Sequence, residues 1–305
     1  MELAWKSYTA YGEEERVGDT ALAMVANHLK SRGCRQLAVT ASVEIPSGEY
    51  KMLSIRVEKR LRDLCGQKQI PCHGVERRVN PLLKSPGVTV TGAGEVCAQT
   101  AVGREKETQD RKDIWEKRES EKCIPYSQGE EEIYCVGLPA LSAALQLKRQ
   151  EKKILEQRFS SAFLEEMERW KEEQFLKDRC FLQGNGISGW YQTEEGGIFA
   201  ALWKMAESKC CGFEVELKQI PLLQEVIEIC EHFRLNPYLM QSAGCMIVTS
   251  GKDLEQELGE QEVFVKRIGR LKEGKEKLLK NGEEIRCLDR PAPDEWLKWL
   301  GGERE

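Results

Sequence analysis

The sequence predicts an α+β protein built from two domains. The chain has 305 residues, enough for two domains of ordinary size, each with its own core. In the first half, residues 37–45 alternate apolar and polar side chains, as a half-buried strand requires, and helical patterns flank them. In the second half, helix and strand patterns alternate, which predicts an α/β sandwich. A charged stretch at 101–132 separates the halves, so the domains are expected at 1–100 and 133–300.

The elements of the first half follow from apolar periodicity and from the residues that end each segment. A helix is expected at Thr20–Arg32, followed by the strand at 37–45 and a second helix over 49–66. A further strand is expected at Val88–Thr91. It runs into Gly92-Ala93-Gly94, where a turn is favoured over a phosphate-binding loop.

Charged residues of both signs fill the segment 103–132, with Ile114 and Trp115 almost its only large apolar residues. Such a segment cannot bury enough apolar surface to offset the entropy lost on ordering. We predict a mobile loop or a solvated helix. A docking element around Trp115 is the alternative.

The second half begins with a predicted long polar helix over 150–178. One narrow apolar stripe repeats along it at helical spacing, formed by Phe163, Met167 and Trp170. A helix, a strand, a helix and a strand follow at 198–205, 213–217, 223–230 and 245–249. Asn281-Gly282 between two apolar runs predicts a hairpin turn.

Composition and charge narrow the classes of function. The net charge is −5 and no basic stripe is present, which argues against nucleic acid as a partner. No apolar run reaches the roughly 20 residues that span a bilayer, and the start of the chain lacks signal-peptide features, so we expect a cytoplasmic protein without a membrane segment. The 12 cysteines are scattered without the paired spacing of a zinc site. We expect them to be small buried side chains, with metal or redox use as the alternative.

Several motifs in the second half resemble the C-terminal domain of the AIR-synthase-related superfamily. They run in the family's order from Glu195-Gly196-Gly197 through Ile220-Pro221 and Leu235-Asn236-Pro237-Tyr238 to Ser242-Ala243-Gly244. The superfamily includes aminoimidazole ribonucleotide synthase, thiamine-monophosphate kinase, selenophosphate synthetase and the hydrogenase-maturation carbamoyl dehydratase, whose branch is the most similar. The first half resembles the family's N-terminal domain more faintly.

The resemblance implies a fold, a dimer and a chemistry. In the family, the N-terminal sheet pairs with that of a second copy to form a β-barrel across a dimer interface. ATP and magnesium lie near that interface, held by a glycine-rich loop and several aspartates. The shared reaction is phosphoryl transfer from ATP, often to an amide or carboxyl-type oxygen. The resemblance therefore implies a homodimer, and ATP with magnesium as possible cofactors.

The sequence departs from the family at its acidic positions. The family's Asn-Asp pair is Asn27-His28 here, and the acidic pair before the Gly-Gly is Tyr191-Gln192. Thr9-Ala10-Tyr11 lacks the family's aspartate, and a later turn keeps only Glu76 and one displaced glycine. The family's early strand and glycine-rich loop have no counterpart. A truncated, degenerate N-terminal domain is therefore expected, because magnesium-dependent phosphoryl transfer needs carboxylates to hold the metal.

We therefore expect a non-catalytic or weakly active relative, a pseudoenzyme that acts as a dimeric scaffold for a protein partner or a small ligand. A chain without a selected role fits the same departures. The alternative is an active ATP-dependent enzyme that phosphorylates an amide or carboxyl-type oxygen, as in hydrogenase maturation or purine synthesis. Its candidate ligand-binding residues are Asn27, Glu76, Glu195, Gly196 and Gly197.

Two interpretations stay open at Glu195-Gly196-Gly197. The glycines at this helix start could let backbone N–H groups approach an anionic ligand, or the strand-to-helix turn simply needs small residues. His28 and His73 are either replacement ligands or tolerated substitutions. No catalytic residue and no metal site is assigned from the sequence.

Overall fold

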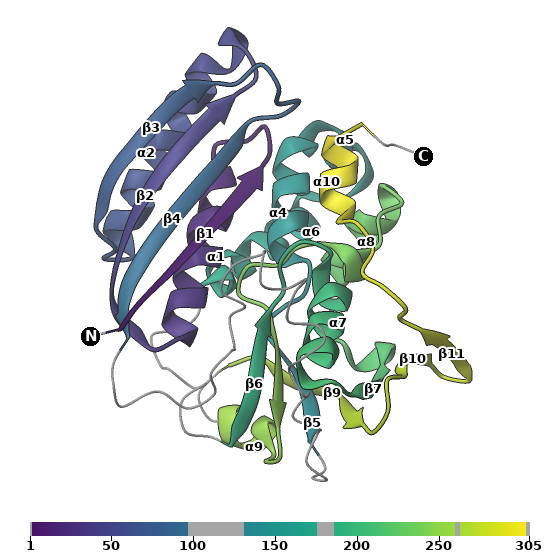
Figure 1. Cartoon of the computed structure of the whole chain (residues 1–305). Coiled ribbons are helices and arrows are strands. Elements are labelled where there is room, and N and C mark those ends of the chain that lie inside the picture. Colours follow the sequence, from purple (N-terminus) through teal and green to yellow (C-terminus); the bar gives the residue numbers. More distant parts are fainter. Residues whose placement is uncertain (1, 97–130, 176–185, 260–262, 303–305) are drawn as a thin grey trace.

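Two mixed β-sheets organise the residues that the computed structural model describes, which are 2–96, 131–175, 186–259 and 263–302 (Figure 1). The predicted α+β class is confirmed. Most of the charged segment, including Trp115, lies outside the described residues. Within the described residues, no helix combines the length and the apolar character needed to cross a membrane.

The first sheet has four strands in the order β1-β4-β2-β3, with β2 and β3 parallel and the other neighbours antiparallel. Helices α1 and α2 cover one face of this sheet (Figure 1). The bounds are β1 Glu2–Tyr11, α1 Val17–Ser31, β2 Cys34–Ile45, η1 Gly48–Tyr50, α2 Lys51–Gln67, β3 Cys72–Val79 and β4 Gly87–Val96. The predicted helices and the strand at 37–45 are present. β1 and β3 were not predicted.

Helix α1 lies between the two domains. Every residue of α1 except Lys30 is buried, whereas a surface helix keeps one polar face. One side packs on the four-stranded sheet. On the other side, the His28 ring meets Trp190 edge-on, with 5.4 Å between ring centroids, and the Ser31 hydroxyl lies 3.6 Å from the Met246 sulfur.

The prediction of a turn at Gly92-Ala93-Gly94 is wrong, because these residues continue β4. Gly92 faces α1, where an added Cβ would lie 2.6 Å from Val25 Cγ1. At Gly94, an added Cβ would lie 2.7 Å from Cys34 Cβ. The glycines therefore allow close packing of the sheet and do not turn the chain.

The second sheet has seven strands in the order β11-β10-β7-β9-β5-β8-β6. β7 and β10 are parallel, and the other neighbouring pairs are antiparallel. The strands are β5 Glu132–Val136, β6 Ile187–Gln192, β7 Gly212–Glu216, β8 Met246–Ser250, β9 Val265–Lys272, β10 Lys277–Asn281 and β11 Glu284–Cys287. The hairpin predicted at Asn281-Gly282 is confirmed by the pairing of β10 with β11.

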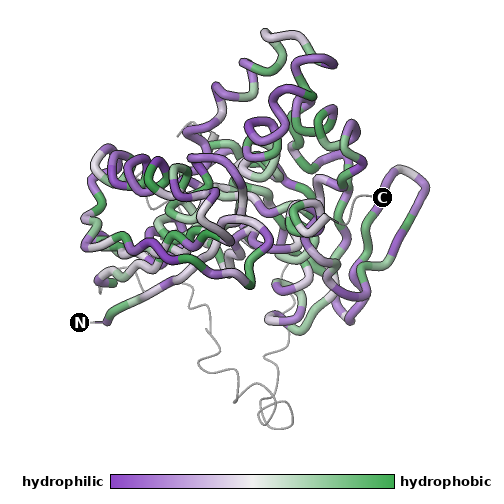
Figure 2. The backbone as a smooth tube through the Cα atoms, turned by 90° about the horizontal axis from the view of Figure 1, so that it is seen from above, coloured by the Kyte–Doolittle hydropathy of each residue, from purple (hydrophilic) through white to green (hydrophobic). Residues whose placement is uncertain are grey.

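The helices of the second domain gather in two groups. α7 packs on the sheet with the cluster around Phe213, and the other large cluster joins α4, α6, α8 and α10 around Trp296. Along the tube in Figure 2, hydrophilic and hydrophobic residues alternate in short stretches, as expected of elements with one buried side. The bounds are α4 Leu141–Gln150, α5 Lys152–Arg158, α6 Ser161–Arg169, η4 Trp170–Gln174, α7 Gly197–Lys209, η5 Leu217–Gln219, α8 Gln224–His232, η6 Pro237–Leu239, α9 Leu254–Gly259 and α10 Glu295–Leu300.

The single helix predicted over 150–178 is wrong, because the chain breaks it into α5, α6 and η4. Phe159 is extended, and the Ser160 hydroxyl accepts a hydrogen bond from Phe163 N–H, which starts a new helix. Of the predicted stripe, Met167 on α6 is fully buried, whereas Phe163 on α6 and Trp170 in η4 are partly buried against the same cluster. Six described cysteines are buried: Cys34, Cys65, Cys135, Cys211, Cys230 and Cys245.

Candidate functional site

Two of the positions that the resemblance matches to the family's acids, Asn27-His28 and Tyr191-Gln192, lie at one seam between α1 and β6. Asn27 is fully buried, and its Nδ2 donates to the Gln174 carbonyl oxygen at 2.7 Å. From β6, Gln192 Nε2 donates to the Met24 carbonyl oxygen at 3.1 Å. His28 and Trp190 pack beside these bonds. The structure thus places Asn27-His28 and Tyr191-Gln192, far apart in sequence, on two sides of one contact.

The donor set of this seam does not suit magnesium. Mg²⁺ prefers hard oxygen ligands, above all carboxylates, and the seam presents amide and imidazole groups. The Asn27 and Gln192 amide nitrogens already donate to backbone carbonyls across the seam. Within the ranges that the structure describes, no group of three or more His, Cys, Asp or Glu side chains is placed to hold a metal ion.

A buried carboxylate, Asp294, closes the start of α7. Its Oδ2 accepts from Gly196 N–H at 3.0 Å and from Gln241 N–H at 2.8 Å. Its Oδ1 accepts from the N–H groups of Trp296 and Leu297 at 3.0 and 3.2 Å, which caps α10. Burial raises the pKa of Asp294 to about 6. The hydrogen bonds from the four N–H groups act in the opposite direction and lower it, but burial has the larger effect. The Gly196 N–H therefore already has an anionic partner inside the protein.

The two glycines adopt conformations that other residues avoid. Gly196 has φ +83° and Gly197 has φ +66°. At Gly197 an added Cβ would lie 2.4 Å from the Tyr238 carbonyl oxygen. These facts favour the interpretation in which the turn needs small residues.

A polar pocket of about 410 Å³ lies beside this turn, between β1 and the start of α7. It is lined by Lys6, Ser7, Tyr8, Thr9, Tyr11, Glu194, Glu195 and Lys204. Glu195 is exposed here, and Lys6 Nζ pairs with Glu194 Oε1 at 2.5 Å. The Tyr8 hydroxyl donates to Gln241 Oε1, and burial, with the charge of Glu194 next, raises the pKa of Tyr8 well above its usual range. The pocket can hold a small polar molecule through ammonium, carboxylate and hydroxyl groups.

The predicted site residues are only partly brought together. Glu195 lines the pocket, and Gly196 and Gly197 lie directly behind it. Asn27 lies in the α1–β6 seam. Glu76 lies on β3, at the opposite edge of the sheet from β1, where it pairs with Arg78 at 2.5 Å. Arg78, by hydrogen bonding, lowers the pKa of Glu76.

Sequence reasoning missed the β1 side of the pocket and Asp294. Lys6 and Tyr8 lie on a strand whose two largest apolar residues, Leu3 and Trp5, are exposed, so apolar alternation gave no clear signal. Asp294 precedes the apolar run of α10, a position typical of a helix N-cap, and that signal could have found it.

No protein-family model matches the sequence, and no curated protein matches it. Solved structures do match. Hydrogenase maturation protein HypE in complex with ATP is 14% identical, with a TM-score of 0.68, and covers 97% of this chain and 87% of that chain. The HypE–HypF complex gives 13% identity, a TM-score of 0.64, and coverage of 95% and 90%. Thiamine-monophosphate kinase from Stenotrophomonas maltophilia K279a is 16% identical, with a TM-score of 0.63, and the match covers 92% of this chain and 85% of that chain.

These likenesses establish the fold: an α+β protein with a four-stranded and a seven-stranded mixed sheet. The chain shares the fold of HypE and thiamine-monophosphate kinase over nearly its whole length. The resemblance drawn from the motifs of the second half is confirmed at this level.

Proposed function

We propose that this chain is a dimeric binding scaffold of the AIR-synthase-related fold, with weak catalytic activity or none. The observation that carries the proposal is the α1–β6 seam. Where the resemblance places the family's acids, this chain has Asn27, His28 and Gln192, which pack against the other domain. Phosphoryl transfer depends on positioned metal ions, and these amide and imidazole side chains are poor ligands for magnesium compared with carboxylates.

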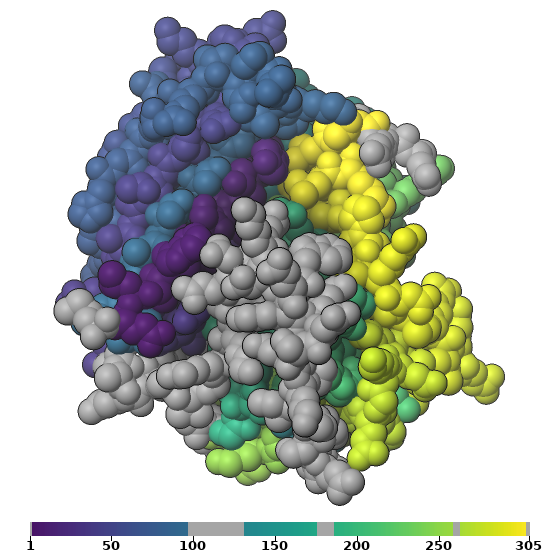
Figure 3. All heavy atoms as spheres, in the orientation of Figure 1, coloured from purple at the N-terminus to yellow at the C-terminus, as the bar shows by residue number. Residues whose placement is uncertain are grey.

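The outer face of the four-stranded sheet supports the dimeric part of the proposal. α1 and α2 lie on the other face, and the purple and blue atoms of the sheet are open in Figure 3. On this face Trp5 is 69% exposed and Leu3 is 68% exposed. Short hydroxyl side chains pair across β1 and β4, as in Ser7 with Thr91 at 2.9 Å. A second copy would cover the apolar side chains, and short side chains let two sheets approach closely.

Sedimentation velocity tests the dimer, with Trp5→Glu as the variant. We expect the wild type to sediment as a dimer, and the variant's dimer dissociation constant to rise about 30-fold or more, as for a central aromatic at an interface. Leu82→Glu is the matched control, because Leu82 is 91% exposed and lies outside the sheet. A wild type that stays monomeric at every concentration contradicts the dimer.

The polar pocket supports a second candidate function, an active ATP-dependent enzyme. The pocket places Glu195 beside Lys6 and Lys204, which could contact an anionic ligand. HypE has been solved with ATP, and a thiamine-monophosphate kinase with AMPPCP and TMP. Titration calorimetry with ATP and magnesium, then ADP, separates the two candidates. Micromolar binding that Glu195→Ala abolishes favours the enzyme, and no heat at millimolar nucleotide favours the scaffold.

The proposed scaffold acts by binding another protein. HypE forms a complex with HypF, which is the precedent for a protein partner on this fold.

A further inference from the structure

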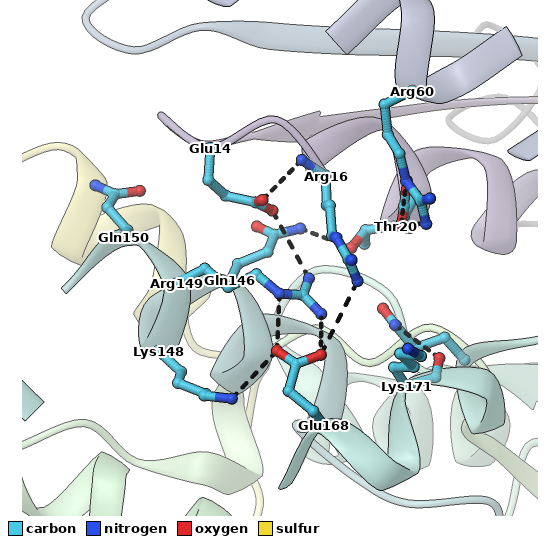
Figure 4. Close-up of polar contacts among 12 residues, drawn as sticks. Glu14, Arg16, Thr20, Arg60, Gln146, Lys148, Arg149, Gln150, Glu168 and Lys171 are labelled. Carbon is cyan, nitrogen blue, oxygen red and sulfur yellow. Dashed lines mark hydrogen bonds and ion pairs between the residues drawn. The ribbon is translucent and has the colours of Figure 1, made fainter. Parts of the chain in front are cut away.

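A second cavity, of about 520 Å³, lies where the loop before α1 meets α4, α5 and α6 (Figure 4). It shares no lining residue with the pocket beside β1. It is lined by Glu14, Glu15, Arg16, Lys148, Arg149, Lys152, Glu156, Ser161, Leu164, Glu165 and Glu168. Its size is within the range of small-molecule sites, roughly 300–1,000 Å³.

Three cations converge on one carboxylate in this cavity (Figure 4). Arg149 donates to both oxygens of Glu168, through Nε and Nη2, each at 3.1 Å. Lys148 Nζ donates to Glu168 Oε1 at 3.2 Å, and Arg16 Nη1 lies 4.0 Å from Oε2. Burial would raise the pKa of Glu168, but Arg149 and Lys148 outweigh it and hold the pKa at about 2. Glu168 is therefore ionised, and three cations surround this one carboxylate.

Glu14 is the second carboxylate of the group, and its pairing is incomplete. Its Oε2 accepts from Arg16 N–H at 2.7 Å. Its Oε1 is buried, has no hydrogen-bond partner in the described part of the chain, and lies 3.9 Å from Arg149 Nη1. Burial raises the pKa of Glu14 to about 7, against the lowering effect of Arg149. Near neutral pH a large fraction of the molecules therefore carry no charge on Glu14.

The remaining acids of the lining lie at the rim. Glu15 pairs with Arg56 at 3.7 Å and Glu156 with Lys152 at 3.6 Å, and the side chains of both glutamates are about half exposed. The third, Glu165, is exposed. Solvent and their partners screen these charges, so they oppose an incoming anion weakly. In contrast, the Arg149 and Lys148 side chains are only 15% and 12% exposed. Desolvated cations bind an oxyanion more strongly than exposed ones.

We propose that this cavity binds a small anion bearing phosphate or carboxylate groups, held by Arg16, Lys148 and Arg149. Glu168 occupies part of that cation set and marks where an oxyanion is favoured. A planar guanidinium has five N–H donors, of which Glu168 takes two from Arg149, and the ammonium of Lys148 has further donors. The first turn of α6, with Ser161 on the wall, adds a favourable helix dipole.

The bound anion would join the two domains. Glu14 and Arg16 come from the first domain, whereas Lys148, Arg149 and Glu168 come from the second. Ligand binding to the folded state therefore raises the melting temperature with ligand concentration.

The test is a thermal-shift and calorimetric titration of the full chain at constant ionic strength, with inorganic phosphate and with succinate as probes. We expect a saturable rise in melting temperature with at least one probe, and the stronger of the two identifies the source of the anionic group. Arg16→Met should weaken binding about tenfold, the loss typical of one charge-assisted contact. In this variant Glu168 retains its ion pairs with Arg149 and Lys148. Arg149→Met should weaken it further. Lys153→Met, at an exposed position of α5 outside the lining of both cavities, is the matched control and should leave binding unchanged.

A pH series with sulfate, whose charge is constant from about pH 6 to 8, adds a second readout. Affinity should fall as the pH rises and Glu14 ionises, and Glu14→Gln should flatten this dependence. Absence of saturable binding at millimolar probe, or equal affinity in the wild type and the two arginine variants, overturns the proposal.

Discussion

The two junctions between the domains are built from different chemistry. At the α1–β6 seam, polar side chains bind backbone atoms across the junction, and the nearby Asp294 binds backbone N–H groups within the second half of the chain. At the cavity around Glu168, charged side chains bind one another, and one side is open. The first arrangement fixes the domains and uses its donors internally. The second contributes less to stability and keeps donors for a ligand, so a fold can lose one binding site and retain another.

The largest expected effect is beside the first junction, with Asp294→Ala. The substitution removes the cap of α10 and leaves the N–H groups of Gly196 and Gln241 buried without their acceptor. We expect the free energy of unfolding to fall by about 3–5 kcal/mol, measured by urea denaturation. Asp289→Ala, at an exposed position nearby, should change it by less than about 0.5 kcal/mol.

If Asp294→Ala does not fold, Asp294→Asn provides the measurement, because an amide oxygen still accepts from part of this set. Its loss should be smaller than that of alanine. Similar small losses for Asp294 and Asp289 variants would contradict the role of this carboxylate.

A smaller effect, of the opposite sign, is expected at the charged junction with Glu14→Gln. Burial raises the pKa of Glu14 from its ordinary value of 4.5 to about 7 in the folded protein, so the folded state binds this proton more tightly than the unfolded state. Ionised Glu14 therefore destabilises the fold, and this cost develops as pH rises from about 4.5 to 7. The variant should gain about 1–3 kcal/mol relative to wild type between pH 5 and pH 8.

Urea denaturation at both pH values measures this difference, with the half-exposed Glu15→Gln as the control. The opposite result would be a Glu14→Gln variant that becomes less stable relative to wild type as the pH rises from 5 to 8. It would show that the attraction of Arg149 and Arg16 for ionised Glu14 exceeds the cost of burying its charge.

The fold was predictable from sequence where local periodicity decides the structure. The helices that became α1, α2, α7 and α8, and the strand that became β2, each carry a clear apolar repeat. The prediction failed at Gly92 and Gly94, because glycine marks a turn and a close approach equally well, and only the position of α1 distinguishes the two. The break at Ser160 was also missed, since helical residues stand on both sides of it.

The candidate site was less predictable because it depends on contacts between distant segments. Asn27 and Gln192 were singled out by resemblance, but nothing local indicates that they meet at one seam. The same holds for Arg149 and Glu168, which lie among many charged residues of similar spacing. Burial and pairing, which separate a functional charge from a solvated one, arise only when the helices pack.

The smallest expected effect is at the ion pair of Lys6 and Glu194, which joins β1 to the turn before α7. Both side chains are 21% exposed, so the pair belongs to the charged type although it lies beside the neutral junction. A double-mutant cycle with Lys6→Met and Glu194→Gln should give a coupling energy of about 0.2–1 kcal/mol. Unfolding in about 1 M salt should reduce that coupling, because added ions screen exposed charges. A coupling that exceeds the effect of Asp294→Ala would reverse the comparison, because the exposed charged contact would then contribute more to stability than the buried carboxylate.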